Sequence, residues 1–243
     1  MLTADQQRMK AEPLRVAGRS RSAMAGAFAR LRRWWIRRGR TRLSADDPSF
    51  QPYRSLARQL LADFPCADGG RTIIVSSVTS LPTETLLTLC YFMRDELGSS
   101  ILVVDGTGRE DGLGGRLGHS RLPGFLDLLH SDDKRLSDLV QQTGRPGIAV
   151  LPPGRPPGDG PVALRAARVE RFFDEARRAF DYVVVQQPAI LEDRGFLRFA
   201  ASADAVLLLV EEGRTGLDDL AKCRMVLEGY QVENVRVVLC TAR

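Results

Sequence analysis

The sequence lacks the residues and runs on which several common functions depend. It has two histidines and four cysteines among 243 residues, and the cysteines form no C-x-x-C pair. Metal-like Cys/His spacing is therefore absent, and we expect Cys90 and Cys240, which lie in apolar runs, to be buried free thiols in a reducing compartment. No apolar run approaches the ~18–20 residues that span a bilayer. The N-terminus has no apolar core of a secretory signal, so a cytoplasmic location is predicted.

Acidic residues are scarce only at the N-terminus. Residues 1–43 contain eleven Arg and one Lys against two acidic residues, a net charge of +10. The other 200 residues carry 23 basic and 28 acidic side chains, a net charge of −5. The basic charge is thus confined to one segment, and the rest of the chain lacks the basic surface of a nucleic-acid binder.

We interpret residues 1–45, which show no β-strand pattern, as a basic segment in front of a globular domain at 46–243. Within it, residues 23–38 can form a helix that carries Trp34 and Trp35. Basic side chains beside paired Trp suit an anionic membrane surface or the cytoplasmic end of a membrane partner. A disordered basic tail is the alternative. The basic residues beside the Trp pair are Arg32, Arg33, Arg37 and Arg38.

Strand and helix patterns alternate through the rest of the chain. Short, almost entirely apolar strands separated by helices predict an α/β domain with a mostly parallel central sheet and helices on both faces. Ligands of such sheets bind outside the carboxyl ends of the strands. The predicted strands are 72–76, 101–105, 148–151, 182–185, 205–210 and 235–239. The predicted helices are 50–64, 85–97, 124–129, 136–141, 162–180, 195–201 and 217–230.

The loop after the first of these strands has neither glycine nor lysine. Residues 71–88 have the pattern of a strand, a loop and the start of a helix, which is the unit that holds phosphate in P-loop proteins. In those proteins the phosphate is bound by unpaired N–H groups at the helix start, by a Gly-rich loop and by a Lys side chain. Glu84 would repel phosphates, and the Cβ atoms of Leu81 and Thr83 hinder close backbone approach. Thr85 keeps a hydroxyl, which alone does not bind a nucleotide. The residues of this degenerate phosphate loop are Ser77, Leu81, Thr83, Glu84 and Thr85.

Two polar residues at other strand ends complete the candidate site. Asp105 can bind Mg²⁺ through water beside a phosphate loop, or it can cap the turn that follows it. Gln186 is neutral and replaces poorly the acid that a nucleotide hydrolase needs there. The Gly-rich segment 112–118 lacks dinucleotide-binding spacing, and we expect a flexible loop.

Seven segments of the chain, in this order and spacing, resemble the bacterial tyrosine kinases. These are cytoplasmic P-loop domains that accompany capsular and exopolysaccharide co-polymerases and are related to the MinD/ParA ATPases. The resemblance covers about 50–239 and implies a P-loop NTPase-like, three-layer α/β/α fold. The segments are QPYRSLARQLL, IIVSSVTSLPTETLLT, ILVVDGTGRED, PGFLDLL, VLPPGRPP, FDYVVVQQPAI and ADAVLLLVEEGRT.

The resemblance also implies that several working positions have been replaced. The Walker A lysine has become Glu84, and the Walker B aspartate has become Gln186. The second aspartate of the family's paired acidic motif is Thr107, whereas Asp105 and Arg109 are kept. In the opening helix, the ring-assembly motif E-x-x-R-x-x-R has become Gln51, Arg54 and Ala57.

The leading hypothesis is therefore a non-catalytic, pseudokinase-like component of polysaccharide synthesis and export, with no cofactor. Its partner would be a membrane co-polymerase or an active kinase paralogue. The alternative is an ATP-dependent tyrosine autokinase or ATPase that uses ATP and Mg²⁺, with Asp105 and Arg109 as catalytic residues and Thr85 and Asp105 as metal ligands. A third hypothesis is a MinD/ParA-like positioning adaptor held on membranes by Trp34 and Trp35.

Overall fold

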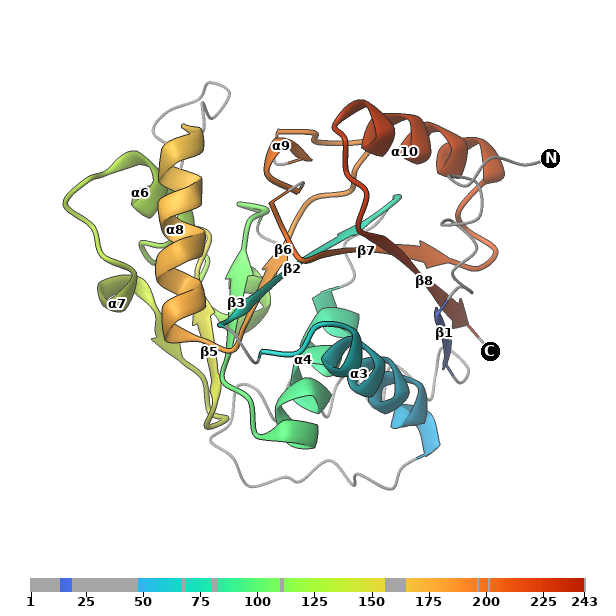
Figure 1. Ribbon diagram of the computed structural model, residues 1–243, viewed down its shortest axis with the longest axis horizontal. Helices are drawn as coiled ribbons and strands as arrows, with labels where there is room; N and C mark the ends of the chain where they lie inside the picture. Colours follow the sequence, from blue (N-terminus) through green and yellow to red (C-terminus); the bar gives the residue numbers. More distant parts are fainter. Residues whose placement is uncertain are drawn as a thin grey trace.

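An eight-stranded sheet with the order β1-β8-β7-β2-β6-β3-β5-β4 runs through the computed structural model (Figure 1). All neighbouring strands are parallel except β4, which is antiparallel to β5. The predicted mostly parallel sheet is confirmed. The strands are β1 (Leu14–Gly18), β2 (Arg71–Ser77), β3 (Ile101–Asp105), β4 (Gln141–Gln142), β5 (Ile148–Leu151), β6 (Tyr182–Gln186), β7 (Ala205–Glu211) and β8 (Val235–Ala242).

Helices cover both faces of the sheet, which confirms the predicted α/β/α layers. In Figure 1, α3 and α4 lie on one side of the sheet, and α8, α9 and α10 lie on the other. A short 3-10 helix, η1 (Pro48–Phe50), leads into α3. The α-helices are α3 (Gln51–Asp63), α4 (Thr83–Leu97), α5 (Leu113–Leu117), α6 (Phe125–His130), α7 (Leu136–Leu139), α8 (Ala166–Ala179), α9 (Leu197–Ala200) and α10 (Leu217–Gly229).

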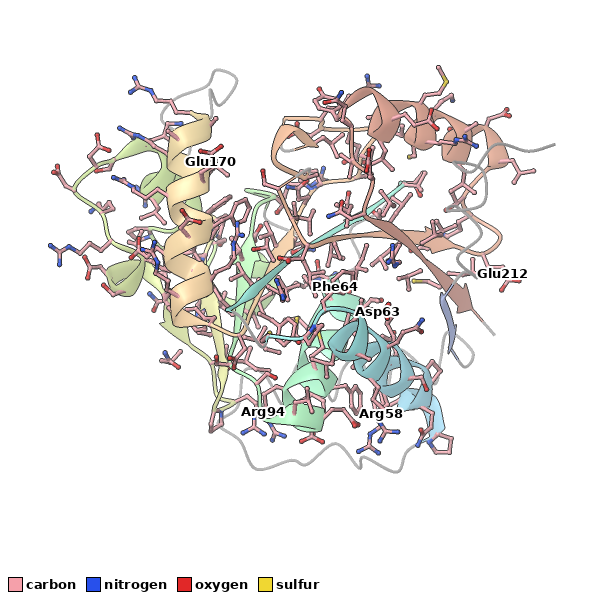
Figure 2. The ribbon with its side chains drawn as sticks, viewed as in Figure 1. Arg58, Asp63, Phe64, Arg94, Glu170 and Glu212 are labelled. Atoms are coloured by element: carbon pink, nitrogen blue, oxygen red, sulfur yellow. The ribbon has the colours of Figure 1, made fainter. Side chains whose placement is uncertain are left out.

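The core consists of two hydrophobic clusters, one on each face of the sheet. Alternate residues of a strand point to opposite faces, so Ile73 and Val75 join the cluster beneath α3 and α4, while Ile74 joins the other. Burial of Leu56 and Leu60 in α3 confirms the helical period predicted there. Figure 2 shows the side chains, and the exposed ones include Arg58 on α3 and Glu170 on α8. Their charges lie on the outer surface of each helical layer.

The four cysteines are free thiols, as predicted. Cys90 is buried as expected, and Cys223 is buried as well. Cys240 was also expected to be buried, but it lies on the edge-side strand β8 and is half-buried, as is Cys66. Burial raises the pKa of the Cys90 thiol to about 12, so this residue is a core hydrophobe rather than a nucleophile.

Two expectations about strands are wrong. Residues 1–45 were expected to contain no strand, but β1 forms there and pairs in parallel with β8. Its pairing partner is distant in sequence, so the local composition did not reveal the strand. The helix predicted at 136–141 ends at Leu139, and Gln141 pairs with Val150 of β5 instead.

The structure describes residues 14–18, 48–66, 69–79, 83–109, 112–155, 165–195, 197–200 and 202–242. Leu81 and the Trp34–Trp35 pair with its neighbouring arginines lie outside these ranges. Among the helices described, none is long and apolar enough to cross a membrane.

Candidate functional site

Asp105 and Gln186 meet at the carboxyl edge of the sheet. β6 lies between β2 and β3, and the register sets Gln186 beside Asp105 on one side and Val75 on the other. The loop that follows β2 leads to α4, whose first residue is Thr83. The three segments that carry the predicted site residues therefore converge, as expected for adjacent parallel strands.

The carboxylate of Asp105 is fully buried and accepts three hydrogen bonds. Its Oδ1 accepts from the backbone N–H of Thr107 at 2.9 Å and from the Thr107 hydroxyl at 2.6 Å. Its Oδ2 accepts from the backbone N–H of Gly114 at 2.6 Å. Both oxygens of Asp105 thus hold backbone segments in place, which is the geometry of a cap.

The side-chain amide of Gln186 is also used within the chain. Its Oε1 accepts from the backbone N–H of Leu113 at 3.1 Å, and its Nε2 donates to the Thr83 hydroxyl at 2.8 Å. Gln186 is 1% exposed. A neutral amide suits this place because it donates to one neighbour and accepts from the other, which a carboxylate cannot do.

The Gly-rich segment expected to be a flexible loop contains a short helix, α5. Asp105 and Gln186 bind its first backbone N–H groups, which have no partner within the helix. Glycine permits the close approach: a Cβ at Gly114 would lie 2.6 Å from Cδ of Pro153. Gly118 ends the helix with a φ of 78°. The prediction failed because side chains at the ends of two strands cap this helix, and one of them, Gln186, is distant in sequence.

Glu84, at the position of the phosphate-loop lysine, pairs with a cation from α5. Its Oε1 lies 2.8 Å from Nη1 of Arg116, and both side chains are partly exposed. Arg116 was not among the predicted site residues. The acidic charge of Glu84 is a signal that could have suggested a basic partner, but sequence alone could not choose among many arginines. The ion pair joins the start of α4 to α5.

Charge reversal across this ion pair should have a small, specific effect on stability. We expect Glu84→Lys to lower the free energy of unfolding by about 0.5–1 kcal/mol, because exposed pairs contribute little. Adding Arg116→Glu should recover most of the loss. Urea unfolding of the two single variants and the double variant measures the coupling. As a control, Glu84→Lys is combined with Arg178→Glu, an exposed change on α8, and the two losses of unfolding free energy should simply add. If the losses from Glu84→Lys and Arg116→Glu also simply add, the pairing is contradicted.

The other described residues of the phosphate loop, Ser77, Thr83 and Thr85, make contacts within the domain. Ser77 and Thr83 are buried, and the Ser77 carbonyl accepts from the backbone N–H of Ile190 at 2.9 Å. The hydroxyl of Tyr53, in α3, hydrogen-bonds with the Thr85 side chain; burial raises the Tyr53 pKa to about 12 although this bond lowers it. Thr85 is thus tied to α3.

The predicted catalytic and assembly residues at the periphery are engaged in ion pairs. Arg109 pairs with Glu192 at 3.1 Å, and both are about half exposed. Arg54 pairs with Glu96 of α4 at 2.8 Å. Burial opposes ionisation of Glu96, but hydrogen bonds from Arg58 and Arg54 outweigh it and hold its pKa below the usual value. Gln51 is exposed at the start of α3.

Taken together, the polar groups at this edge bind one another. Among the described residues, no group of three or more His, Cys, Asp or Glu side chains could hold a metal ion. The N–H groups at the start of α5 are taken by Asp105 and Gln186. In this arrangement α5 is fastened to the ends of β3, β6 and α4.

Curated relatives of the chain carry the names of tyrosine kinases. The chain is 28% identical over 204 residues to the "Putative tyrosine-protein kinase EpsB" of Ralstonia nicotianae, which covers 81% of this chain and 26% of that protein. It is 23% identical over 136 residues to the tyrosine-protein kinase CpsD of Streptococcus agalactiae, over 55% of this chain and 58% of that protein. The chain thus spans about a quarter of the length of EpsB. No family model matches it.

Solved structures show the same fold. The BceF tyrosine kinase domain superposes with a TM-score of 0.74 at 20% identity, over 99% of this chain and 98% of that one. The MinD cell division protein of Aquifex aeolicus gives a TM-score of 0.52 at 19% identity, over 70% and 68% of the two chains. The homologues of this chain are therefore bacterial tyrosine-protein kinases, and its fold is that of tyrosine kinase domains and of MinD.

Proposed function

We propose that this chain is a non-catalytic, pseudokinase-like component of exopolysaccharide or capsular polysaccharide synthesis and export. The resemblance and the tyrosine-kinase relatives support this choice of pathway. It works at the cytoplasmic face of the plasma membrane, through a membrane co-polymerase or an active kinase paralogue. The basic segment with Trp34 and Trp35 provides a contact with anionic lipid or with that partner.

The closed polar network at the carboxyl edge carries this proposal. A nucleotide site needs free donors for phosphate oxygens and free oxygens for the Mg²⁺ shell. Here both oxygens of Asp105 and both polar atoms of Gln186 are already bound to groups of the same chain. The edge that would bind a ligand instead anchors α5.

The charges at the edge also fit Mg·ATP poorly. Glu84 places an anion where a phosphate loop has its lysine, so it repels the β- and γ-phosphates. Its partner Arg116 neutralises that charge rather than leaving a cation for the nucleotide. The hydroxyl of Thr85, which would join the Mg²⁺ shell, hydrogen-bonds with Tyr53. Each group that would hold the cofactor serves the fold.

Calorimetric titration of the purified chain with Mg·ATP tests the proposal. We expect no binding at concentrations that saturate an active tyrosine kinase domain, which serves as the positive control. Micromolar binding would contradict the proposal. Phosphotyrosine that forms on the chain with ATP, vanishes in Asp105→Asn and persists in Glu170→Gln would instead favour the autokinase alternative. Glu170→Gln is the control because it also removes one acidic charge, from an exposed residue of α8 that is not part of the candidate site.

A further inference from the structure

The outward face of α10 carries a stripe of apolar side chains. Leu217 is 84% exposed and Met225 is 71% exposed, and Ala221 between them is exposed as well. Their spacing of four residues places all three on one line along the helix. In Figure 1, α10 lies at the top of the molecule, on the opposite side of the sheet from α3 and α4. We call Leu217, Ala221 and Met225 the α10 stripe.

The stripe is not the core-facing side of the helix. Cys223 and Leu227 are buried, and Leu220 and Val226 pack against the cluster beneath α10. These four residues already form the apolar side that a surface helix needs. α10 is therefore apolar on two opposite sides, and the described part of the chain covers only one of them.

Charged residues of both signs flank the α10 stripe. Asp218 and Lys222 lie one turn apart on one flank, and both are exposed. Within its own helix Lys222 pairs with Asp219 at 3.1 Å, an exchangeable surface ion pair. Arg224 and Glu228 lie toward the other flank and form an ion pair at 2.7 Å. A helix that lies on anionic lipid has Lys and Arg along its polar face. The balanced charges here disfavour a membrane or a nucleic acid and suit a protein surface of equally mixed charge.

We propose that the α10 stripe is a self-association surface, on which a second copy of the chain packs its own α10 in antiparallel orientation. A two-fold axis beside Ala221 would set Leu217 of each copy against Met225 of the other. The same axis sets Asp218 near Lys222 of the other copy, twice. The pattern of charge and apolar residues is thus complementary to itself, as an isologous two-fold interface requires.

Side-chain size supports this register. Residues at i and i+4 form the ridges that interdigitate when two helices pack. Ala221, the smallest residue of the stripe, lies at the centre, where the two helices approach most closely. One helix face falls in the class of interfaces that bury less than about 1,200 Å² in total, so the dimer is weak and depends on concentration. α10 lies on the opposite face of the sheet from Gln51 and Arg54, so this surface is independent of the assembly motif.

Sedimentation velocity of the full chain over a wide concentration range tests the proposal. We expect a reversible dimer that Met225→Glu weakens roughly tenfold or more, since it buries a charge at the interface. Leu97→Glu is the matched control, because Leu97 is 66% exposed on α4 and lies outside the stripe. Circular dichroism should show equal helix content in both variants. A wild-type chain that stays monomeric throughout overturns the proposal, as does a dimer that only Leu97→Glu disrupts.

Charge reversal tests the orientation of the two helices. Asp218→Lys and Lys222→Asp should each weaken the dimer, because each sets like charges against one another across the axis. The double variant should recover most of the affinity. Failure to recover would overturn the antiparallel register. Vesicle binding that Met225→Glu abolishes would assign the stripe to lipid instead. None of these results depends on nucleotide binding. The dimer can therefore be disproved without disproving the proposed function, and the reverse also holds.

Discussion

Replacing Asp105 with alanine is expected to lower the free energy of unfolding by about 3 kcal/mol, because it leaves buried donors without acceptors. The backbone N–H groups of Thr107 and Gly114 lose their partner, and only the Thr107 hydroxyl can turn elsewhere. Asp105 is fully buried, and its contact with the backbone N–H of Gly114 is buried as well. Urea unfolding at neutral pH, followed by circular dichroism, measures the loss.

The Asp105→Ala variant should also hold α5 less firmly. Hydrogen exchange of residues 112–118 is expected to rise, because the cap of the helix is removed while its sequence is unchanged. Glu192→Ala is the matched control, since it removes an acid from a half-exposed pair near the same edge. Its cost should stay below about 1 kcal/mol. A similar small cost for Asp105→Ala would contradict the structural role of this carboxylate and favour a functional one.

The fold was predictable from the sequence because its signals are local. The strand 101–105 consists of four apolar residues and a terminal Asp, and the structure places β3 there with the same bounds. The helix at 217–230 ends within one residue of α10. Such elements are long enough, or apolar enough, for pattern and packing to agree.

The parts that failed depend on partners distant in sequence. α5 contains two glycines in five residues and forms because Asp105 and Gln186 cap it. β1 has an Arg in a five-residue strand and exists through its pairing with β8. A local pattern contains no information about such partners, so both elements were invisible to it.

The candidate site divides in the same way. The meeting of Asp105 with Gln186 followed from the rule that parallel strands end at one edge, and the register places the two side by side. The contact between Glu84 and Arg116 did not follow, since it depends on the position of α5. The sequence predicted the replaced residues, and the structure adds what they now bind. These contacts show that residues of the phosphate loop and of the strand ends hold α5 in place.

Gln186→Glu tests the hydrogen-bond network around α5 most directly, because the substitution changes the charge of the side chain at 186 and almost keeps its shape. The introduced carboxyl group can still accept from the Leu113 N–H, and the Thr83 hydroxyl can turn to donate to it. The new charge would be buried beside the Asp105 carboxylate on the adjacent strand. Burial and the like charge both disfavour ionisation. We expect a loss of about 3 kcal/mol at pH 7 relative to wild type, equivalent to a pKa raised by roughly two units.

The loss should disappear in acid, and its direction follows from proton linkage. Below about pH 4.3 the introduced group is protonated in both folded and unfolded chains, so the variant matches wild type. Above that pH the unfolded chain ionises first, and the loss grows by about 1.4 kcal/mol per unit until the folded chain ionises as well. Urea unfolding of both proteins from pH 4 to 8 measures this difference. Gln142→Glu, exposed on β4, should show none of it. A variant as stable as wild type at pH 7 would mean that a cation compensates the two carboxylates, and would favour the metal-binding alternative for Asp105.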